Sequence, residues 1–251
     1  MRQKIRKTLI FISFLLFPVT IWYFSPALII QAASEHIMNG SFFVFTAMLV
    51  GSLFLGRVWC GWLCPAGGLQ ECAARCNDRP ARQGQRDKIK FVIWIIWIVT
   101  VIVTFILGKN RVTIDFFFMT DHGISVTGIN NYVVYYGVLF LLVLPVLFHG
   151  RRAACHYLCW MAPFMIIGST VGRFLHLPQL HIEADPSACV SCGKCSRECP
   201  MGLDVPSMAE AGKTASCTEC TLCGACVDAC PKKVLKYRMV WRSANGKRQK
   251  D

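Results

Sequence analysis

The sequence predicts two parts: an all-α membrane domain of four transmembrane helices in two repeats, then a small α+β domain rich in cysteine. Composition gives the first reason, because 54% of the 251 residues are hydrophobic, 16% are charged and the mean hydropathy is +0.45. An ordinary soluble domain is less apolar. The second reason is a set of four long apolar stretches, and the third is the polar, cysteine-rich composition that begins after Leu177.

The membrane domain is expected over residues 1–176. A helix needs about 17–25 apolar residues to cross a bilayer. Four stretches of that length are present, over residues 8–24, 41–58, 91–107 and 132–148. A shorter apolar stretch, 161–175, contains Arg173 and is expected to be re-entrant or interfacial.

Lysine and arginine are distributed unevenly around these spans. They cluster before the first span, between the second and third, and after the fourth, whereas the opposite loops hold only Lys109 and Arg111. The positive-inside rule therefore predicts a multi-pass protein of the cytoplasmic membrane, with both termini in the cytoplasm. The first stretch also has the basic start of a signal peptide. It is long for a signal core, so we interpret it as a span.

Each pair of spans leads to a C-x3-C motif. The first half ends in G-R-V-W-C-G-W-L-C-P and the second in G-R-R-A-A-C-H-Y-L-C-W, with Arg57 and Arg152 each three residues before the first cysteine. If the halves are related by a pseudo-twofold axis along the membrane normal, the half-sites 60–64 and 155–159 meet at one level. The four thiols brought together, hereafter the membrane set, are Cys60, Cys64, Cys155 and Cys159.

The membrane set is a candidate for an iron–sulfur cluster. Four soft thiolate ligands suit such a cluster better than a hard cation. Pro65 indicates that the helix breaks beside the first motif, which would expose backbone N–H groups that favour an anionic cluster. The alternative is that these cysteines are small buried side chains that pack helices.

The C-terminal domain, expected over 182–240, contains C-x2-C-x2-C-x3-C-P twice. In this ferredoxin run three closely spaced thiolates hold one 4Fe-4S cluster, and the fourth cysteine ligates the other cluster. Zinc is the competing ligand for C-x2-C pairs, but two complete copies with the trailing proline favour iron–sulfur clusters. The cluster 1 set is thus Cys189, Cys192, Cys195 and Cys230, and the cluster 2 set is Cys199, Cys220, Cys223 and Cys226.

Three cysteines remain outside these sets. Cys72 and Cys76 repeat the C-x3-C spacing and could extend the membrane site, ligate a further centre or simply pack, whereas Cys217 is expected to be a spare thiol. The total of fifteen is odd and the spacings do not resemble a disulfide framework. The cysteines therefore indicate a reducing compartment.

The net charge of +13 does not indicate nucleic acid as a partner. Most basic residues flank apolar segments, where the lipid bilayer explains them, and residues 241–251 form a basic tail. Each 4Fe-4S cluster with four thiolates would contribute a net charge of about −2, which offsets part of the excess.

The motifs resemble those of a known family. C-G-W-L-C-P followed by G-G-L-Q-E, the later C-H-Y-L-C and the paired ferredoxin runs are similar to the membrane-bound 4Fe-4S ferredoxins. That family includes the quinol-oxidising subunit of periplasmic nitrate reductase systems and the membrane domain of nitrous-oxide reductase regulators. The resemblance implies four spans, cytoplasmic ferredoxin clusters and electron exchange with a membrane redox pool. Trp160 stands where family members often have a second proline.

These observations predict an electron-transfer subunit with no substrate chemistry of its own. It would link a membrane redox pool, with quinone as a candidate, or another membrane redox subunit to a soluble cytoplasmic oxidoreductase. One alternative is a redox-sensing or assembly factor for a metalloenzyme. Another is a module of an ion-translocating redox complex, although the spans show no run of buried acids suited to a proton relay.

Overall fold

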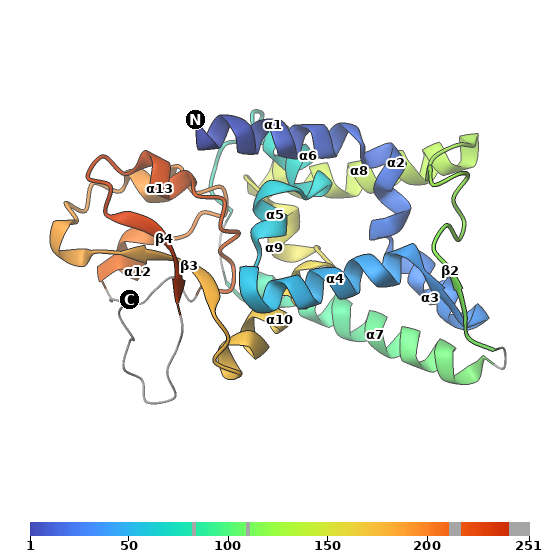
Figure 1. Ribbon diagram of the computed structural model, residues 1–251. Helices are drawn as coiled ribbons and strands as arrows, with labels where there is room; N and C mark the ends of the chain where they lie inside the picture. Colours follow the sequence, from blue (N-terminus) through green and yellow to red (C-terminus); the bar gives the residue numbers. More distant parts are fainter. Residues whose placement is uncertain (82–83, 109–110, 211–216, 241–251) are drawn as a thin grey trace.

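A computed structural model of the chain describes residues 1–81, 84–108, 111–210 and 217–240. A body of roughly aligned helices carries a small domain at one end (Figure 1). The N-terminus lies at that same end, where the guanidinium of Arg2 pairs with Asp228 of the small domain at 2.6 Å. The predicted basic tail, 241–251, lies outside the described residues.

The helical body contains helices of very different length and one short two-stranded parallel sheet, in which Ile37 is opposite Thr113. The sequence did not suggest this pairing. In chain order its elements are α1 (Arg2–Leu15), α2 (Phe17–Thr20), η1 (Ile21–Phe24), α3 (Pro26–Glu35), β1 (Ile37–Asn39), α4 (Gly40–Leu55), α5 (Val58–Trp62), α6 (Pro65–Ala73), η2 (Gln85–Lys88), α7 (Ile89–Leu107), β2 (Thr113–Asp115), α8 (Ile129–His149), α9 (Ala153–Tyr157) and α10 (Ala162–Phe174).

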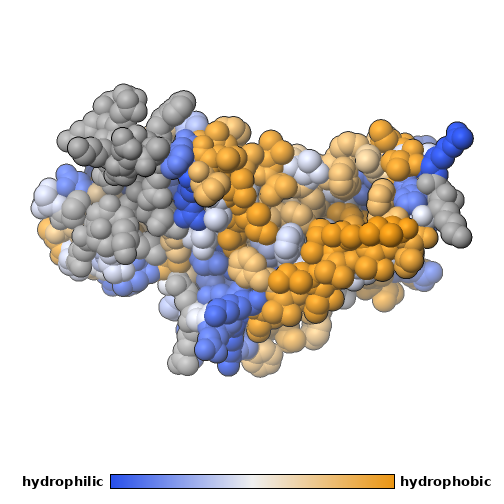
Figure 2. Space-filling view, turned by 90° about the horizontal axis from the view of Figure 1, so that it is seen from below, coloured by the Kyte–Doolittle hydropathy of each residue, from blue (hydrophilic) through white to orange (hydrophobic). Residues whose placement is uncertain are grey.

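Two helices of the described residues are long and apolar enough to cross a membrane by themselves. They are Gln85–Leu107, with a mean hydropathy of 2.6, and Ile129–His149, with a mean hydropathy of 2.0. Both coincide with predicted spans. Large apolar side chains on α7 point outward, for example Ile106 at 72% exposure, and hydrophobic residues gather over the helical body (Figure 2). A lipid environment removes the cost of that exposure.

The first two predicted spans are less regular. The helix pair Arg2–Leu15 and Phe17–Phe24 is bent by 58°, so this segment can count as one broken span. Pro18 lies just after the bend and cannot donate the backbone hydrogen bond of a continuous helix. Helix α4 has 16 residues, which is shorter than a full bilayer crossing. Hydropathy alone did not reveal the break or the shorter length.

Helix α10, which the sequence predicts to be re-entrant or interfacial, packs along α4. The approach is close because glycines of α10 face the neighbouring backbone. A Cβ atom on Gly168 would lie 2.7 Å from the carbonyl oxygen of Leu49, and one on Gly172 would collide with the carbonyl oxygen of Leu53. This packing fixes the segment that follows the second C-x3-C motif.

The small domain begins and ends in one antiparallel strand pair, in which Gln179 is opposite Val240 and Ala184 is opposite Leu235. Gly193 and Gly224 start the short helices of the two ferredoxin runs with φ of 67° and 71°, values that a residue with a side chain rarely adopts. The elements are β3 (Gln179–Ala184), η3 (Pro186–Ala188), α11 (Lys194–Arg197), α12 (Val205–Glu210), α13 (Ala225–Ala229) and β4 (Leu235–Val240).

Candidate functional site

The two C-x3-C motifs have the same local backbone. Helix α5 starts one residue after Arg57 and α9 starts one residue after Arg152. Each helix lasts five residues, and the chain then turns away at the second cysteine. The N–H of Cys64 donates to the carbonyl of Trp59 at 3.0 Å, and the N–H of Cys159 donates to Ala154 at 3.0 Å.

The break after each motif arises from different residues. Pro65 is the first residue of α6 in the first half. In the second half Trp160 replaces that proline, yet the chain still breaks, and Pro163 stands in the first turn of α10. A proline at this position is compatible with a helix start but not with continuation of the preceding helix.

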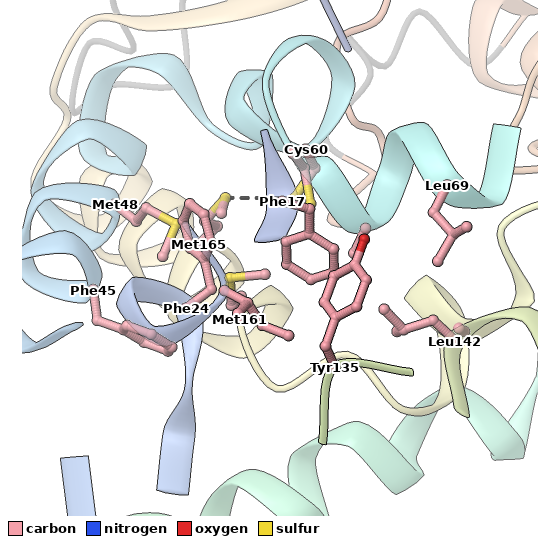
Figure 3. Close-up of a cluster of buried hydrophobic side chains, with 14 of the residues drawn as sticks. Phe17, Phe24, Phe45, Met48, Cys60, Leu69, Tyr135, Leu142, Met161 and Met165 are labelled. Atoms are coloured by element: carbon pink, nitrogen blue, oxygen red, sulfur yellow. Dashed lines mark hydrogen bonds between the residues drawn. The ribbon is translucent and has the colours of Figure 1, made fainter. Parts of the chain in front are cut away.

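The four thiols of the membrane set lie together. Cys64 interacts electrostatically with each of the other three. The Cys60 thiol contacts Sδ of Met165 at 3.6 Å, and Phe17, Phe24 and Met161 belong to the surrounding apolar cluster (Figure 3). An apolar shell of this kind excludes water and thereby influences the reduction potential of a bound centre. Sequence reasoning expected these four residues to meet; the structure places their thiols within electrostatic reach of one another, and their use as cluster ligands stays a prediction.

Arg57 supplies positive charge beside these thiols. Its side chain is 2% exposed and interacts electrostatically with Cys60, Cys155 and Cys159. Its Nε and Nη2 atoms have no hydrogen-bond partner among the described residues. Nη1 pairs with the carboxylate of Glu219 at 2.9 Å, so the two remaining donors are the ones that are costly to bury without an acceptor. The site therefore fits an anionic group such as a thiolate-ligated 4Fe-4S cluster, which carries a net charge of about −2.

Arg152, the residue of the second half that corresponds to Arg57, links the two halves by hydrogen bonds. Its Nη1 donates to the carbonyl of Cys60 at 2.7 Å, and its Nη2 donates to Glu71 at 2.6 Å. Arg6 pairs with the same carboxylate at 2.7 Å. Burial opposes ionisation of Glu71, but the charges of Arg152 and Arg6 outweigh it and lower its pKa.

Gln70 binds one thiol directly. Its Nε2 donates to Sγ of Cys155 at 3.2 Å, and its Oε1 accepts from the backbone N–H of Cys155 at 3.3 Å. The side chain is 1% exposed. Sequence reasoning gave no role to Gln70 or Glu71, although both stand in the G-G-L-Q-E stretch that follows the first motif.

The cluster 1 set lines one cavity of the small domain. All four of its cysteines contribute to the wall, together with apolar residues such as Val205 and Leu235. Among the described residues no three His, Cys, Asp or Glu side chains converge closely enough to hold a single metal ion. Thiols that surround a cavity suit a group of several atoms, such as a 4Fe-4S cluster.

The cluster 2 set is more deeply buried. Cys199, Cys223 and Cys226 are each 7% exposed, and Cys220 interacts electrostatically with all three. Burial, followed by the neighbouring Cys223 and Cys199, raises the pKa of Cys226 to about 12. Such thiols ionise readily only when a cation such as iron offsets their charge.

The three remaining cysteines lie outside the membrane set and the two ferredoxin sets. Cys72 lines an outer groove with Lys7 and Arg75, and Cys76 is exposed. Cys217 lines a small cavity with Arg57 and Cys220. None of the fifteen cysteines forms a disulfide in the structure.

Two known families match parts of the chain that carry most of these cysteines. The family described as "4Fe-4S binding domain" matches residues 40–83, and the "4Fe-4S dicluster domain" family matches residues 181–238. The chain carries two ferredoxin-type 4Fe-4S binding domains. The predicted iron–sulfur, ferredoxin-type character is therefore confirmed.

Relatives of this ferredoxin-type chain have similar character. The electron transport protein YccM of Escherichia coli is 28% identical over 86% of the chain, which spans 60% of that protein's length. The methylamine utilization ferredoxin-type protein MauN of Methylobacillus flagellatus is 28% identical, with 67% of this chain and 59% of that protein covered. The ferredoxin-type protein NapH of Haemophilus influenzae is 24% identical over 82% of this chain and 71% of its own. No solved structure matches the chain significantly.

The relatives and the two apolar helices support membrane association of this iron–sulfur electron-transport protein. The expected resemblance to membrane-bound ferredoxin-type proteins is thus confirmed.

Proposed function

We propose that the protein is a membrane-anchored subunit that relays single electrons between a membrane redox pool, or a membrane partner, and a cytoplasmic oxidoreductase. The observation that carries the proposal is the meeting of two matched C-x3-C motifs beside the unpaired donors of Arg57. Two complete ferredoxin runs in the attached domain supply further one-electron centres.

The proposal includes three 4Fe-4S clusters. The membrane set would hold one, with two ligands from each half, and the cluster 1 and cluster 2 sets would hold the others. Bound clusters supply reversible one-electron chemistry. The chain's own residues hold the sulfur ligands, exclude water through the apolar shell, and set the potential through Arg57 and through the amide of Gln70.

We also propose four membrane crossings in two repeats, formed by α1 with its bent continuation, by α4, by α7 and by α8. The equal lengths and matched backbone bonds of α5 and α9 support the repeat. The N-terminus and the small domain lie at one end of the helices. Because the basic segments of the sequence belong to the same side, this end is proposed to face the cytoplasm.

Metal analysis of the intact, anaerobically purified chain tests this function. Three clusters require about twelve iron atoms and as many acid-labile sulfides per chain. A value of about eight would remove the membrane cluster, and zinc in place of iron would overturn the whole proposal.

Purification from the native membrane adds a second criterion. A stoichiometric oxidoreductase partner is expected, whereas a partner present only while a metalloenzyme is being assembled would indicate a maturation factor instead.

A further inference from the structure

The segment between the first two membrane-set cysteines, at the end of α5, touches the segment of the small domain that carries Cys223. Gly61 lies so close to this loop that an added Cβ atom would collide with the carbonyl oxygen of Thr221 and lie 3.2 Å from Cα of Cys223. Only glycine allows two backbones to approach in this way. The loop that carries Cys60 is therefore in direct contact with the loop that carries Cys223.

Hydrogen bonds reinforce this contact. Trp62 donates through Nε1 to the carbonyl of Leu222 at 3.1 Å, and the hydroxyl of Tyr237 donates to the same oxygen at 2.7 Å. Leu222 has a φ of 51°, which is uncommon for a bulky residue and must be held by its surroundings. The two donors to its own carbonyl hold the loop in this shape.

The second half-site touches the other segment that supplies cluster 2. His156, which follows Cys155 as Gly61 follows Cys60, is completely buried, and its Nε2 lies 3.2 Å from the carbonyl oxygen of Met201. Met201 is two residues after Cys199. In addition, Cys155 lies in the same buried apolar cluster as Cys199 and Cys226. Both half-sites thus contact cluster 2 ligand segments.

Ion pairs also join the small domain to the helical body at this contact. Glu219, the neighbour of Cys220, accepts from Arg57 at 2.9 Å and from Lys90 at 2.5 Å. Lys90 and Arg57 are 0% and 2% exposed. Burial opposes ionisation of Glu219, but the two cations outweigh it and lower its pKa. The cluster 2 loop is therefore attached to both α7 and the residue that precedes α5.

The cluster 1 set lies in a different environment. Its cavity is walled by residues of the small domain itself, Cys192 is exposed, and Val190 beside it is 58% exposed. Among the described residues, those that line the cavity all belong to the small domain.

From these contacts we infer a fixed order of electron transfer: membrane set, cluster 2, cluster 1, and then the soluble redox partner. This inference rests on the proposed function. In each step one centre is oxidised by one electron and its neighbour is reduced by one, and no bond or proton changes. Because tunnelling falls exponentially with distance, cluster 2 is the direct partner of the membrane centre. Cluster 1 is the centre that exchanges electrons with a soluble one-electron carrier.

Low-temperature paramagnetic resonance of the fully reduced, full-length protein tests the order, because neighbouring reduced clusters broaden one another's signals. Cys223→Ser, which removes a cluster 2 ligand, should sharpen the membrane-set signal. Cys192→Ser, which removes a cluster 1 ligand, should leave that signal unchanged. The reverse pattern, equal changes in both variants, or no change in either would overturn the order.

A second pair of variants keeps every ligand in place. Gly61→Ala should retain about twelve iron atoms but lose the broadening of the membrane-set signal. The matched control is Gly137→Ala on α8, where an added Cβ meets nothing within 4 Å and the broadening should persist. Broadening that survives Gly61→Ala would count against the contact as the transfer route. Wild-type protein with about eight irons and two signals would instead remove the membrane cluster, and with it the first step of the order, before any variant is made.

Discussion

The guanidinium of Arg152 donates a hydrogen bond to the carbonyl oxygen of Cys60 at 2.7 Å, so the second half of the helical body holds the first C-x3-C motif. The same guanidinium pairs with Glu71, which also pairs with Arg6 of the first helix. Arg6 in turn donates to the carbonyl of Gly61 at 3.1 Å. One carboxylate thus organises two buried cations around the 60–64 loop.

Replacing this carboxylate should be strongly destabilising. Glu71→Gln leaves two guanidiniums, 3% and 1% exposed, without their counter-charge. Loss of one partner of a buried ion pair costs about 3–5 kcal/mol of unfolding free energy. Thermal or denaturant unfolding in detergent measures the change. The control is Arg238→Gln, which removes an exposed partner of Glu183 and should cost at most about 1 kcal/mol. Equal losses in the two variants would contradict the structural role of Glu71.

The two half-sites should act as one ligand set. Cys64→Ser and Cys159→Ser are each expected to abolish the same paramagnetic centre, because each half supplies two ligands and neither suffices alone. The ferredoxin signals should survive, since that domain carries a complete set of eight cysteines. If every cluster signal persists in both variants, the membrane cysteines only pack helices. A buried, unpaired serine hydroxyl would then merely cost about 1–3 kcal/mol of stability.

Gln70 should tune the potential of the membrane cluster. Gln70→Leu removes the N–H donor to Cys155, and a donor to a ligand sulfur stabilises the more negative, reduced cluster. The midpoint potential of this centre is therefore expected to fall in a redox titration followed by paramagnetic resonance. Gln179→Leu is a suitable control, because Gln179 is also buried but donates to Leu53 and Ser169. An identical potential in wild type and Gln70→Leu would exclude the amide as a determinant.

Cys72 and Cys76 should be dispensable for cluster binding. Cys72 lines an outer groove and Cys76 is exposed, in contrast to the buried thiols of the membrane set. The double variant Cys72→Ser/Cys76→Ser is expected to retain the iron and sulfide content of the wild type. Loss of about four iron atoms would show that these thiols ligate a centre.

Topology can be measured with reporters at two positions. A reporter fused after Asp251 is expected to be active in the cytoplasm, and one inserted after Gly123, in the loop before α8, should be active on the opposite side. The arginine and lysine distribution supplies the reason. Activity of both fusions on one side of the membrane would require an even number of crossings between them and would remove the four-span topology.

The features that could be predicted from sequence are those encoded locally. Hydropathy located α7 and α8, and spacing alone identified the ferredoxin runs. Each of these signals lies within a short window of the chain.

The missed features depend on contacts between distant segments. Glu219 lies 162 residues from Arg57, and Glu71 lies 65 residues from Arg6, so no periodicity connects either pair. The contact of Gly61 with Thr221 is equally remote. The bend near Pro18 had a local signal, but apolar content hid it within a continuous hydrophobic stretch.

The position of Glu219 also has a consequence for biogenesis. Translation produces Arg57 and Lys90 long before Glu219, the acidic partner that the structure shows for both. In the proposed topology these cations would therefore act, while the helices insert, as retention signals that keep their flanking segments on the cytoplasmic side. After the C-terminal domain has emerged and docked, the same cations are buried beneath it. The residues proposed to orient the nascent chain thus become part of the contact between its two domains.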